Sequence, residues 1–413
     1  MSILDRFVPR IQNLPSHLRL RPGYMVVEEQ PGQFLFHSNT QSFKITLPFP
    51  GISLPEFFKK FAGQQSLTEI LGALPPLHVN FLLDIVETLH RSGLLVPDQN
   101  DNDKIDLRYV ASAHMFDQFQ STKSDNTLKS FFSESIWQER ITKARVGLIG
   151  LGRVGSQLAR LLTIVGVLNI TGIDEGIVDE TLRYTDAWYL EADRGELRAQ
   201  ALGRNLFTLN PQTLFSSLPT PLNDLEQDIF PHEFFNMDVI IVASDHHRPN
   251  LYERINDRCI QAGIPWTSYR PGWTGLTVEI GPTVLPKVTA CYECYQQRRR
   301  SNLANPKYDD MLAAALKNQT FPLLNLQVTP SLSLFCYEIL RLLSGITQPR
   351  TLSAILEFDL NTSELIRHPL LKVPRCPACR RDIQSFAPVR FWSEISTAIT
   401  NTASSDSQNG EGL

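Results

Sequence analysis

The stretch that decides the fold is Ala144–Asp174, with the sequence ARVGLIGLGRVGSQLARLLTIVGVLNITGID. A mostly apolar run comes first, and a glycine-rich segment from Gly150 to Gly155 follows it. An apolar-periodic helix then leads to a second apolar run that ends at Asp174. This order of strand, glycine turn, helix and strand is typical of a βαβ unit that binds an adenine nucleotide. The stretch therefore predicts an α/β, Rossmann-like fold.

The three glycines of this segment have separate physical roles. Gly150 permits the tight turn, Gly152 lets backbone N–H groups approach a phosphate, and Gly155 lets the helix pack closely on the strand. The helix N-terminus offers partial positive charge to an anion, and Asp174 is placed to accept hydrogen bonds from ribose hydroxyls. These four residues are the candidate nucleotide site, if the fold has kept that function.

Length and composition indicate a globular protein of two or three domains. The chain has 413 residues, of which 42% are hydrophobic and 20% charged, and its formal net charge is −4. This charge gives no global electrostatic case for nucleic acid or an anionic membrane. The N-terminal segment lacks the apolar core of a signal peptide, and no stretch approaches the ~20 apolar residues of a membrane span. We expect a cytoplasmic protein with no nucleic-acid or membrane partner.

Residues 1–98 indicate a small α+β domain. Short strand-like runs, the last of them Ser42–Leu47, precede three helical patterns that end with Val79–His90. The order resembles a winged helix of the PqqD-like type, which binds leader peptides of ribosomally made, modified peptides. The resemblance implies that a leader adds as a strand beside Ser42–Leu47 and rests on the last helix. The residues in those places are Phe43, Ile45, Leu47, Phe81 and Ile85. A DNA-binding winged helix is the alternative, although the last helix has no basic stripe.

Shifts in composition divide the rest of the chain. Residues 99–127 are largely polar and predict a linker, residues 128–381 carry the βαβ pattern and its continuation, and residues 382–413 form a C-terminal tail. Within the large domain, the apolar run Met237–Ser244 predicts a buried parallel strand. This strand delivers Asp245 at its C-terminal end, where open α/β sheets place ligand-contacting side chains.

Polar composition also marks a later segment of the large domain. We expect residues 295–327 to be irregular, apart from a helix near Asp309–Leu316. The next helix is expected at Leu332–Leu343, where apolar residues recur with helical periodicity.

Two CxxC pairs, Cys291–Cys294 and Cys376–Cys379, predict a metal site. Four thiolates in this arrangement suit a closed tetrahedral Zn²⁺ site, to which each pair brings two sulfurs. Such a metal would tie a strand-end loop to the C-terminal segment. A redox pair or disulfides are the alternatives, and the presence of two pairs favours structural zinc. The remaining cysteines, Cys259 and Cys336, fit core positions on helices.

Together these features resemble the ThiF-type adenylyltransferases, which are related to ubiquitin-activating enzymes. The resemblance rests on Gly150–Asp174, Asp245 and the two cysteine pairs, and it covers Leu128–Arg381. It implies a Rossmann-like domain with a mixed sheet and zinc knuckles, ATP with Mg²⁺ as a possible cofactor, and a homodimer. With an N-terminal peptide-binding element the chain is similar to two groups of relatives. One group adenylates a peptide C-terminus, and the other presents leader-bound precursors to a YcaO-type azoline cyclodehydratase.

The residues that adenylation needs are only partly present. Asp245 matches the aspartate that the family uses for Mg²⁺ and the reacting phosphate. The family's Asn-x-x-Arg segment falls on Leu182 and Thr185, with Arg183 two positions early, and its Gly-x-x-Lys lysine falls on Arg198. Asp245, Arg198 and Arg183 are therefore the catalytic candidates if the chain is active. Loss of a phosphate-binding arginine costs ~10³–10⁵ in rate by analogy with arginine fingers.

These departures favour a binding function over catalysis. The hypothesis is a ThiF-like protein of thiazole/oxazole peptide biosynthesis that binds a precursor leader peptide and presents it to a YcaO-type cyclodehydratase. An active ATP-dependent adenylyltransferase, acting on a peptide or carrier-protein carboxylate, is the alternative. A NAD-dependent dehydrogenase is disfavoured, because it leaves the cysteine pairs and Asp245 without a role.

Overall fold

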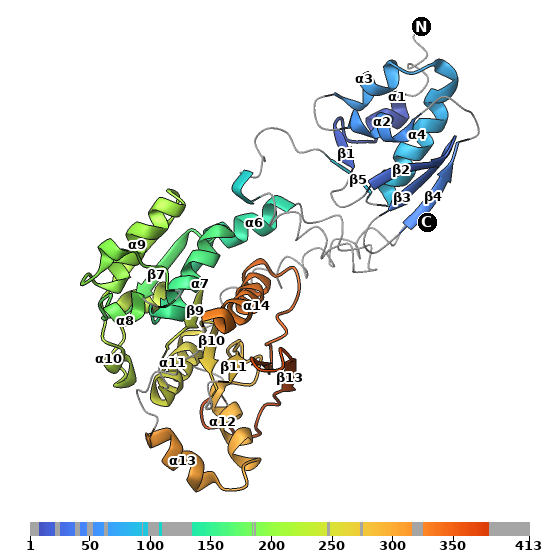
Figure 1. Ribbon diagram of the computed structural model, residues 1–413. Helices are drawn as coiled ribbons and strands as arrows, with labels where there is room; N and C mark the ends of the chain where they lie inside the picture. Colours follow the sequence, from blue (N-terminus) through green and yellow to red (C-terminus); the bar gives the residue numbers. More distant parts are fainter. Residues whose placement is uncertain are drawn as a thin grey trace. The chain divides into compact units, whose positions relative to one another are not determined.

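The computed structural model divides into two compact units, Met1–Gln138 and Glu139–Leu413 (Figure 1). The described residues are 8–20, 25–37, 42–47, 53–61, 65–92, 94–97, 107–109, 134–183, 185, 187–245, 248–272, 276–315 and 325–379. The finer domain boundaries at residues 98, 127 and 381 stay predictions.

The first unit combines a small antiparallel sheet with short helices. Its three-stranded sheet has the order β2-β3-β4, with β2 Met25–Gln30, β3 Gln33–His37 and β4 Ser42–Thr46. A separate antiparallel pair joins β1 Leu18–Leu20 to β5 Leu95–Pro97. The helices are α1 Val8–Gln12, α2 Leu54–Lys59, α3 Leu67–Gly72 and α4 Pro76–Arg91, and a 3₁₀ turn covers Leu107–Tyr109. The expected short strands and the three helices that follow them are present, and the winged-helix, PqqD-like classification stays a prediction.

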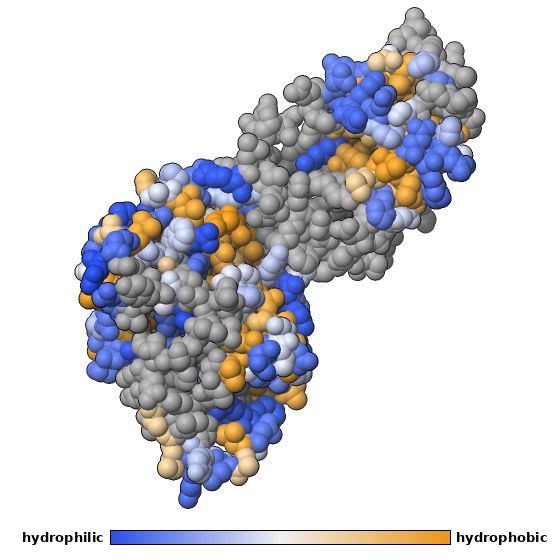
Figure 2. Space-filling view, viewed as in Figure 1, coloured by the Kyte–Doolittle hydropathy of each residue, from blue (hydrophilic) through white to orange (hydrophobic). Residues whose placement is uncertain are grey.

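Local chemistry explains where these elements begin and what they bury. Ser66 and Glu69 form a reciprocal capping box at the start of α3, and Gly32 takes a φ of +77° in the turn between β2 and β3. One face of the sheet is buried through Phe34 and Phe36, which lie in the same core cluster as the apolar side of α4. The other face is more open, and Figure 2 shows an apolar area over β2 and β3 there.

The second unit is built on one mixed sheet of eight strands. Their order is β13-β12-β11-β10-β9-β6-β7-β8. The strands from β8 to β10 are parallel, and those from β10 to β13 are antiparallel. Their bounds are β6 Arg145–Ile149, β7 Asn169–Ile173, β8 Leu214–Leu218, β9 Val239–Val242, β10 Trp266–Pro271, β11 Thr277–Ile280, β12 Ala354–Asp359 and β13 Leu365–Pro369. The expected α/β class with a mixed sheet is confirmed.

Helices connect these strands, and they pack on the sheet and on one another. Their bounds are α6 Glu134–Lys143, α7 Arg153–Ile164, α8 Glu180–Arg183, α9 Arg198–Leu209, α10 Leu222–Glu226, α11 Pro249–Ala262, α12 Tyr292–Ser301, α13 Pro306–Ala315 and α14 Asn325–Ser344. Two 3₁₀ turns cover Glu191–Asp193 and His232–Asn236. Helix α14 packs beside α7, and α11 packs beside α12. No helix in the described part of the chain is long and apolar enough to cross a membrane.

The expectation of an irregular segment at residues 295–327 is wrong at both ends. Helix α12 occupies residues up to Ser301, although only Tyr292 and Cys294 among its side chains are buried. Helix α14 begins at Asn325 and contains Pro330. A helix with so few buried residues shows little apolar periodicity, and an internal proline normally marks a helix end.

The topology brings three strand ends to one edge of the sheet. Strands β7, β6 and β9 are neighbours and run parallel, so their carboxyl ends lie side by side. The residues that follow them are Gly150 after β6, Asp174 after β7 and Asp245 shortly after β9. This edge holds the candidate nucleotide site.

Candidate nucleotide site and metal centre

A pocket lies at the carboxyl ends of these three strands. The residues that line it include Gly150, Gly152, Asp174, Arg198, Asp245 and Arg248. Five of these six are candidates from the sequence, and the fold brings them together from segments up to about a hundred positions apart. The sixth, Arg248, was not predicted.

The three glycines are positions where a side chain does not fit. Gly150 has a φ of +86°, and a Cβ there would lie 2.9 Å from the carbonyl oxygen of Ala243. A Cβ at Gly152 would overlap Oδ2 of Asp245, and one at Gly155 would overlap the carbonyl oxygen of Gly150. The glycines therefore allow the loop, the start of α7 and the end of β9 to approach one another closely.

Asp174 is buried and bound to the backbone of two loops. Its Oδ2 accepts a hydrogen bond of 2.7 Å from the Leu151 amide, and its Oδ1 accepts one of 2.6 Å from the Gly176 amide. The side chain is only 5% exposed. Asp174 thus joins the glycine loop to the segment that follows β7.

Asp245 binds the start of α7. Its Oδ2 accepts a hydrogen bond of 2.6 Å from the Arg153 amide, and its Oδ1 accepts one of 3.1 Å from the Val154 amide. These are two of the N–H groups that the first turn of a helix leaves without a helical partner. The carboxylate therefore caps a helix that lies about ninety positions earlier in the chain.

Arg198 begins α9 and is held by the loop after β7. Its Nε donates to the carbonyl oxygen of Ile177 at 3.0 Å. Its guanidinium lies 3.7 Å from Oδ2 of Asp174 and 3.8 Å from Oδ2 of Asp179. The cation thus faces two carboxylates of this chain. Arg183 ends α8, and its side chain lies outside the described part of the structure.

The two positions that differ from the family pattern carry no charge. Leu182 is 7% exposed and belongs to the core. Thr185 donates its hydroxyl to the carbonyl oxygen of Leu182 and accepts from the Ala187 amide at 3.2 Å. These residues therefore supply neither the amide nor the guanidinium that the family pattern has there.

Two residues near the pocket were missed by the sequence reasoning. Arg248 donates from Nη1 to Asn223 at 2.9 Å and to Glu226 at 3.1 Å. The hydroxyl of Tyr189 donates to the Leu151 carbonyl oxygen at 2.6 Å, and burial raises the pKa of Tyr189 well above its ordinary value. The sequence did offer a signal for Arg248. It lies three positions after Asp245 and directly before Pro249, which begins α11, so it had to lie near the same strand end.

The described residues do not fit a complete phosphate site of the family type. The glycine loop has the close backbone that a phosphate requires, but its amides at Leu151, Arg153 and Val154 already bind Asp174 and Asp245. No cation comes from positions 182 and 185 to offset phosphate charge. The site keeps the frame of a nucleotide-binding fold and lacks part of its chemistry.

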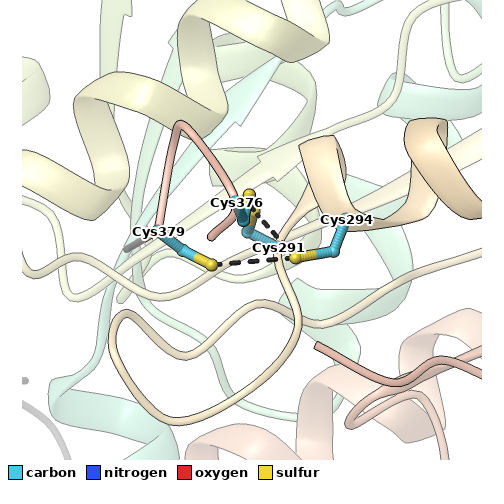
Figure 3. A group of neighbouring side chains, drawn as sticks. All are labelled: Cys291, Cys294, Cys376 and Cys379. Atoms are coloured by element: carbon cyan, nitrogen blue, oxygen red, sulfur yellow. Dashed lines mark hydrogen bonds between the residues drawn. The ribbon is translucent and has the colours of Figure 1, made fainter. Parts of the chain in front are cut away.

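The four predicted cysteine ligands meet at one point (Figure 3). The Sγ atoms of Cys291 and Cys294, of Cys291 and Cys376, and of Cys294 and Cys379 are each 3.7 Å apart. All four sulfurs lie within 4.8 Å of one another. A Zn–S bond of about 2.3 Å places the thiolates of a tetrahedral site about 3.8 Å apart, whereas a disulfide requires about 2.05 Å. The four cysteines therefore could hold one metal ion, and zinc suits them best.

Hydrogen bonds to neighbouring core segments help to hold the cysteines in place. Cys291 and Cys294 lie at the start of α12, and the amide of Val373 donates to Sγ of Cys294 at 3.4 Å. The amide of Tyr292 donates to Asn256 of α11 at 3.0 Å. Cys376 and all its partners are buried. A bound metal would thus join α12 to the segment after β13.

A sequence model of the ThiF family matches residues 124–380, which is more than half of the chain. The chain belongs to the ThiF family. Adenylyltransferases are among the relatives of this ThiF-family chain. It is 25% identical to a sulfur carrier protein adenylyltransferase of Thermus thermophilus, over 59% of this chain and 84% of the other. It is 26% identical to the ThiS adenylyltransferase of Bacillus subtilis, over 59% and 66% of the two chains.

A ubiquitin-activating enzyme is a more distant relative of the ThiF-family chain. Ubiquitin-activating enzyme E1 2 of Triticum aestivum is 20% identical over 58% of this chain, and the match spans only 21% of that enzyme. The family and these relatives support nucleotide-dependent adenylyl transfer as the general activity of the group.

Solved structures show the same fold over most of the ThiF-family chain. Escherichia coli MccB with ATP has a TM-score of 0.60 at 17% identity, and the match covers 88% of this chain and 99% of that one. The microcin C7 biosynthetic enzyme MccB with N-formylated MccA gives the same values. PaaA has a TM-score of 0.58 at 16% identity, with 85% and 99% covered. At these identities the likeness shows the fold alone.

Proposed function

We propose that this ThiF-family chain binds the leader peptide of a ribosomally made precursor through its N-terminal unit and presents that precursor to a YcaO-type cyclodehydratase. In this proposal the nucleotide-type fold serves as a frame, and adenylation is reduced or lost. The observation that carries the proposal is the outer edge of β4, which pairs with no strand in the described part of the chain and carries apolar side chains.

Hydrogen-bond alternation leaves part of β4 free to bind another strand. The Leu47 amide donates to the Gly32 carbonyl oxygen at 2.7 Å, so the backbone groups of Leu47, Ile45 and Phe43 face β3. In an antiparallel ladder, alternate residues face opposite sides. The N–H and C=O groups of Lys44 and Thr46 therefore point to the outer edge, where no strand pairs within the described part of the chain.

Apolar side chains of β4 itself lie beside this edge, and in this proposal those of α4 complete an apolar floor under an added strand. Phe43, Ile45 and Phe81 are partly buried against the core of the unit, and Phe43 stacks on Phe36 with ring centroids 5.0 Å apart. Leu47 and Ile85 are 6% and 7% exposed, so they shape the floor and offer little contact surface of their own. An added strand would gain main-chain hydrogen bonds from the edge and specificity from alternate side chains on this floor.

The related structures support a peptide as the ligand. MccB has been solved with the MccA peptide, and the match to it extends over 88% of this chain, well beyond residues 124–380. The uncharged positions 182 and 185 support a protein that depends less on ATP than an active adenylyltransferase does. A homodimer and a YcaO-type partner complete the proposal.

The decisive experiment is calorimetric titration of the full chain with the leader peptide of a precursor encoded beside its gene. Lys44→Pro removes the N–H that faces the outer edge and keeps the bonds to β3, because proline is tolerated where a strand's N–H faces solvent. We expect Lys44→Pro to lose most of the binding. Lys44→Ala, which removes only an exposed ion pair with Glu29, is expected to keep it.

Two controls separate strand addition from other modes of binding. Val27, on β2, is 50% exposed, and Val27→Thr should leave binding unchanged. Unfolding curves should show that Lys44→Pro is as folded as the wild type. Full binding by Lys44→Pro would contradict strand addition at β4, and the absence of any leader binding by the wild type would end the proposal. Added chain should also accelerate cyclisation of the precursor by the YcaO-type enzyme.

An active adenylyltransferase is the second candidate, favoured by the ThiS adenylyltransferase relatives and by Asp245 in the pocket. Pyrophosphate exchange with ATP and the precursor peptide tests it. Exchange that Asp245→Asn abolishes would support this activity. The leader-binding proposal instead expects exchange near background, together with tight leader binding.

A further inference from the structure

The start of α7 is occupied by carboxylates of this chain. Asp245 accepts from the Arg153 and Val154 amides at 2.6 and 3.1 Å, and Asp174 accepts from the Leu151 amide at 2.7 Å. A Cβ at Gly152 would overlap Oδ2 of Asp245, so this oxygen lies directly on the glycine loop. The place that the helix start offers to an anion is thus filled.

We propose that Asp245 is an internal ligand of the glycine loop, and that a nucleoside di- or triphosphate binds there only when this carboxylate leaves. Removing the carboxylate then creates an open phosphate site in the same loop. The proposal concerns the nucleotide pocket alone, and it holds whether or not the N-terminal unit binds a leader peptide.

Hydrogen-bond capacity gives the first reason for this competition. The Arg153 and Val154 amides are two of the donors at the start of α7, and each amide has one hydrogen to give. A phosphate placed against Gly152 at the start of α7 would need the same two donors. Asp245 and a phosphate therefore compete for these amides.

Charge gives the second reason. Among the described residues that line the pocket, the guanidinium groups belong to Arg198 and Arg248. Arg198 faces Asp174 and Asp179 within 4 Å, and Arg248 donates to Glu226 at 3.1 Å. Each cation already has a carboxylate near it, so neither is available to offset a phosphate placed against Asp245. Like charges at such short range repel strongly in a partly buried pocket.

The test measures binding of ADP to the full chain in EDTA by calorimetry. One hydrogen bond to a charged group corresponds to about tenfold in an equilibrium constant. We expect Asp245→Ala to bind ADP at least about tenfold more tightly than the wild type does. Asp245→Asn keeps one acceptor oxygen and should give a smaller gain.

A matched control removes a carboxylate from the other end of the same strand. Asp238 precedes β9 and binds the backbone and guanidinium of Arg145, away from the pocket. Asp238→Asn changes the net charge as Asp245→Asn does, and it should leave ADP binding as in the wild type. A gain in the control variant equal to that of Asp245→Asn would show a general charge effect and overturn the proposal.

Repeating the ADP titrations with Mg²⁺ in place of EDTA gives a second, independent test. A divalent cation gives the Asp245 carboxylate another partner, so Mg²⁺ should strengthen ADP binding to the wild type more than to Asp245→Ala. A folded Asp245→Ala variant that binds ADP no better than the wild type in EDTA would overturn the proposal. If Asp245→Ala does not fold, the same comparison with Asp245→Asn decides.

Discussion

At the scale of single residues, Gly155 leaves the least room for a side chain among the glycines compared in the described part of the ThiF-type unit. A Cβ at Gly155 would overlap the carbonyl oxygen of Gly150, which is backbone and cannot turn aside. Gly195 is different, because it has a φ of +83° and nothing lies within 4 Å of a Cβ placed there. One glycine is required by packing, and the other by backbone conformation alone.

Substitution of these two glycines by alanine should separate the two effects. Gly155→Ala should lower the free energy of unfolding by about 2 kcal/mol or more, because α7 must move away from the loop. Gly195→Ala should cost about 1 kcal/mol, since only the left-handed backbone is strained. Urea unfolding of the full chain measures both. Equal costs would show that α7 moves freely at Gly155.

Asp193 is a buried carboxylate whose charge is balanced by its neighbours. Burial alone would raise its pKa, but the Leu190 amide, Asn205 and Arg204 together hold that pKa below its ordinary value. Asn205 Nδ2 and the Leu190 amide each donate to Asp193 Oδ2 at 2.7 Å. The ionised form is therefore the one that stabilises the fold.

The stability due to Asp193 should depend on pH in the acid range. Because its folded pKa lies below the unfolded value of about 3.9, the stabilisation is fully present above that value. It is lost as the pH falls through the folded pKa. Asp193→Asn should cost about 2 kcal/mol at pH 7, and the gap to the wild type should close below about pH 4. A gap that stays constant across this range would contradict the assignment. Thermal unfolding at several pH values measures it.

Asp245 illustrates what the sequence could and could not predict about a residue. The apolar run before Asp245 predicts that this residue follows a buried strand. The carboxyl end of a parallel strand in such a fold lies near the glycine loop. The hydrogen bonds of Asp245 to Arg153 and Val154 join segments about ninety positions apart, and no local pattern encodes such a contact. The roles predicted for Asp245 and Arg198 toward ATP stay predictions.

At the scale of elements, periodicity predicted the strands and helices that bury much of their surface. The strand expected within Met237–Ser244 is β9, and the helix expected at Val79–His90 is α4. Helix α12 was missed because its surface is polar on nearly all sides, and the start of α14 was missed because Pro330 lies inside it. The pair of β1 with β5 was missed because three-residue strands carry too little pattern to be recognised.

The start of α12 yields a prediction about metal content. Cys376→Ser should reduce zinc from about one per chain to near zero, because a closed structural site needs four ligands. Cys336→Ser is the matched control, since Cys336 is buried on α14 and lies outside the cysteine cluster. Emission spectrometry on protein purified without chelators measures both variants. Full zinc content in Cys376→Ser would show that the four sulfurs do not form the site.

At the scale of the whole molecule, the chain has two units with separate cores. One core is aromatic and lies between the β2-β3-β4 sheet and α2 to α4. Another lies around β9, α11 and α12 and includes all four cysteine ligands. A metal held by these cysteines would therefore stabilise the second unit, and structural zinc sites contribute on the order of 10 kcal/mol to folding.

Calorimetry of the full chain should reflect this division. We expect two unfolding transitions, of which a zinc chelator lowers one by many degrees and leaves the other in place. The unaffected transition should be the one that shifts when a leader peptide is added, because a ligand stabilises only the state that binds it. A chelator that shifts both transitions equally would contradict separate units.

The cysteine cluster also bears on how this protein tolerates changes in length. Cys291 and Cys376 are 85 positions apart, so a metal bound by both would close a long loop of the chain. The entropy of closing a loop rises only with the logarithm of its length, by about 0.6 kcal/mol for each doubling. Dozens of residues inserted at an exposed point between the two cysteine pairs would therefore add little to the entropic cost of closing the loop. An exposed turn between the two cysteine pairs is therefore a suitable place to insert a reporter.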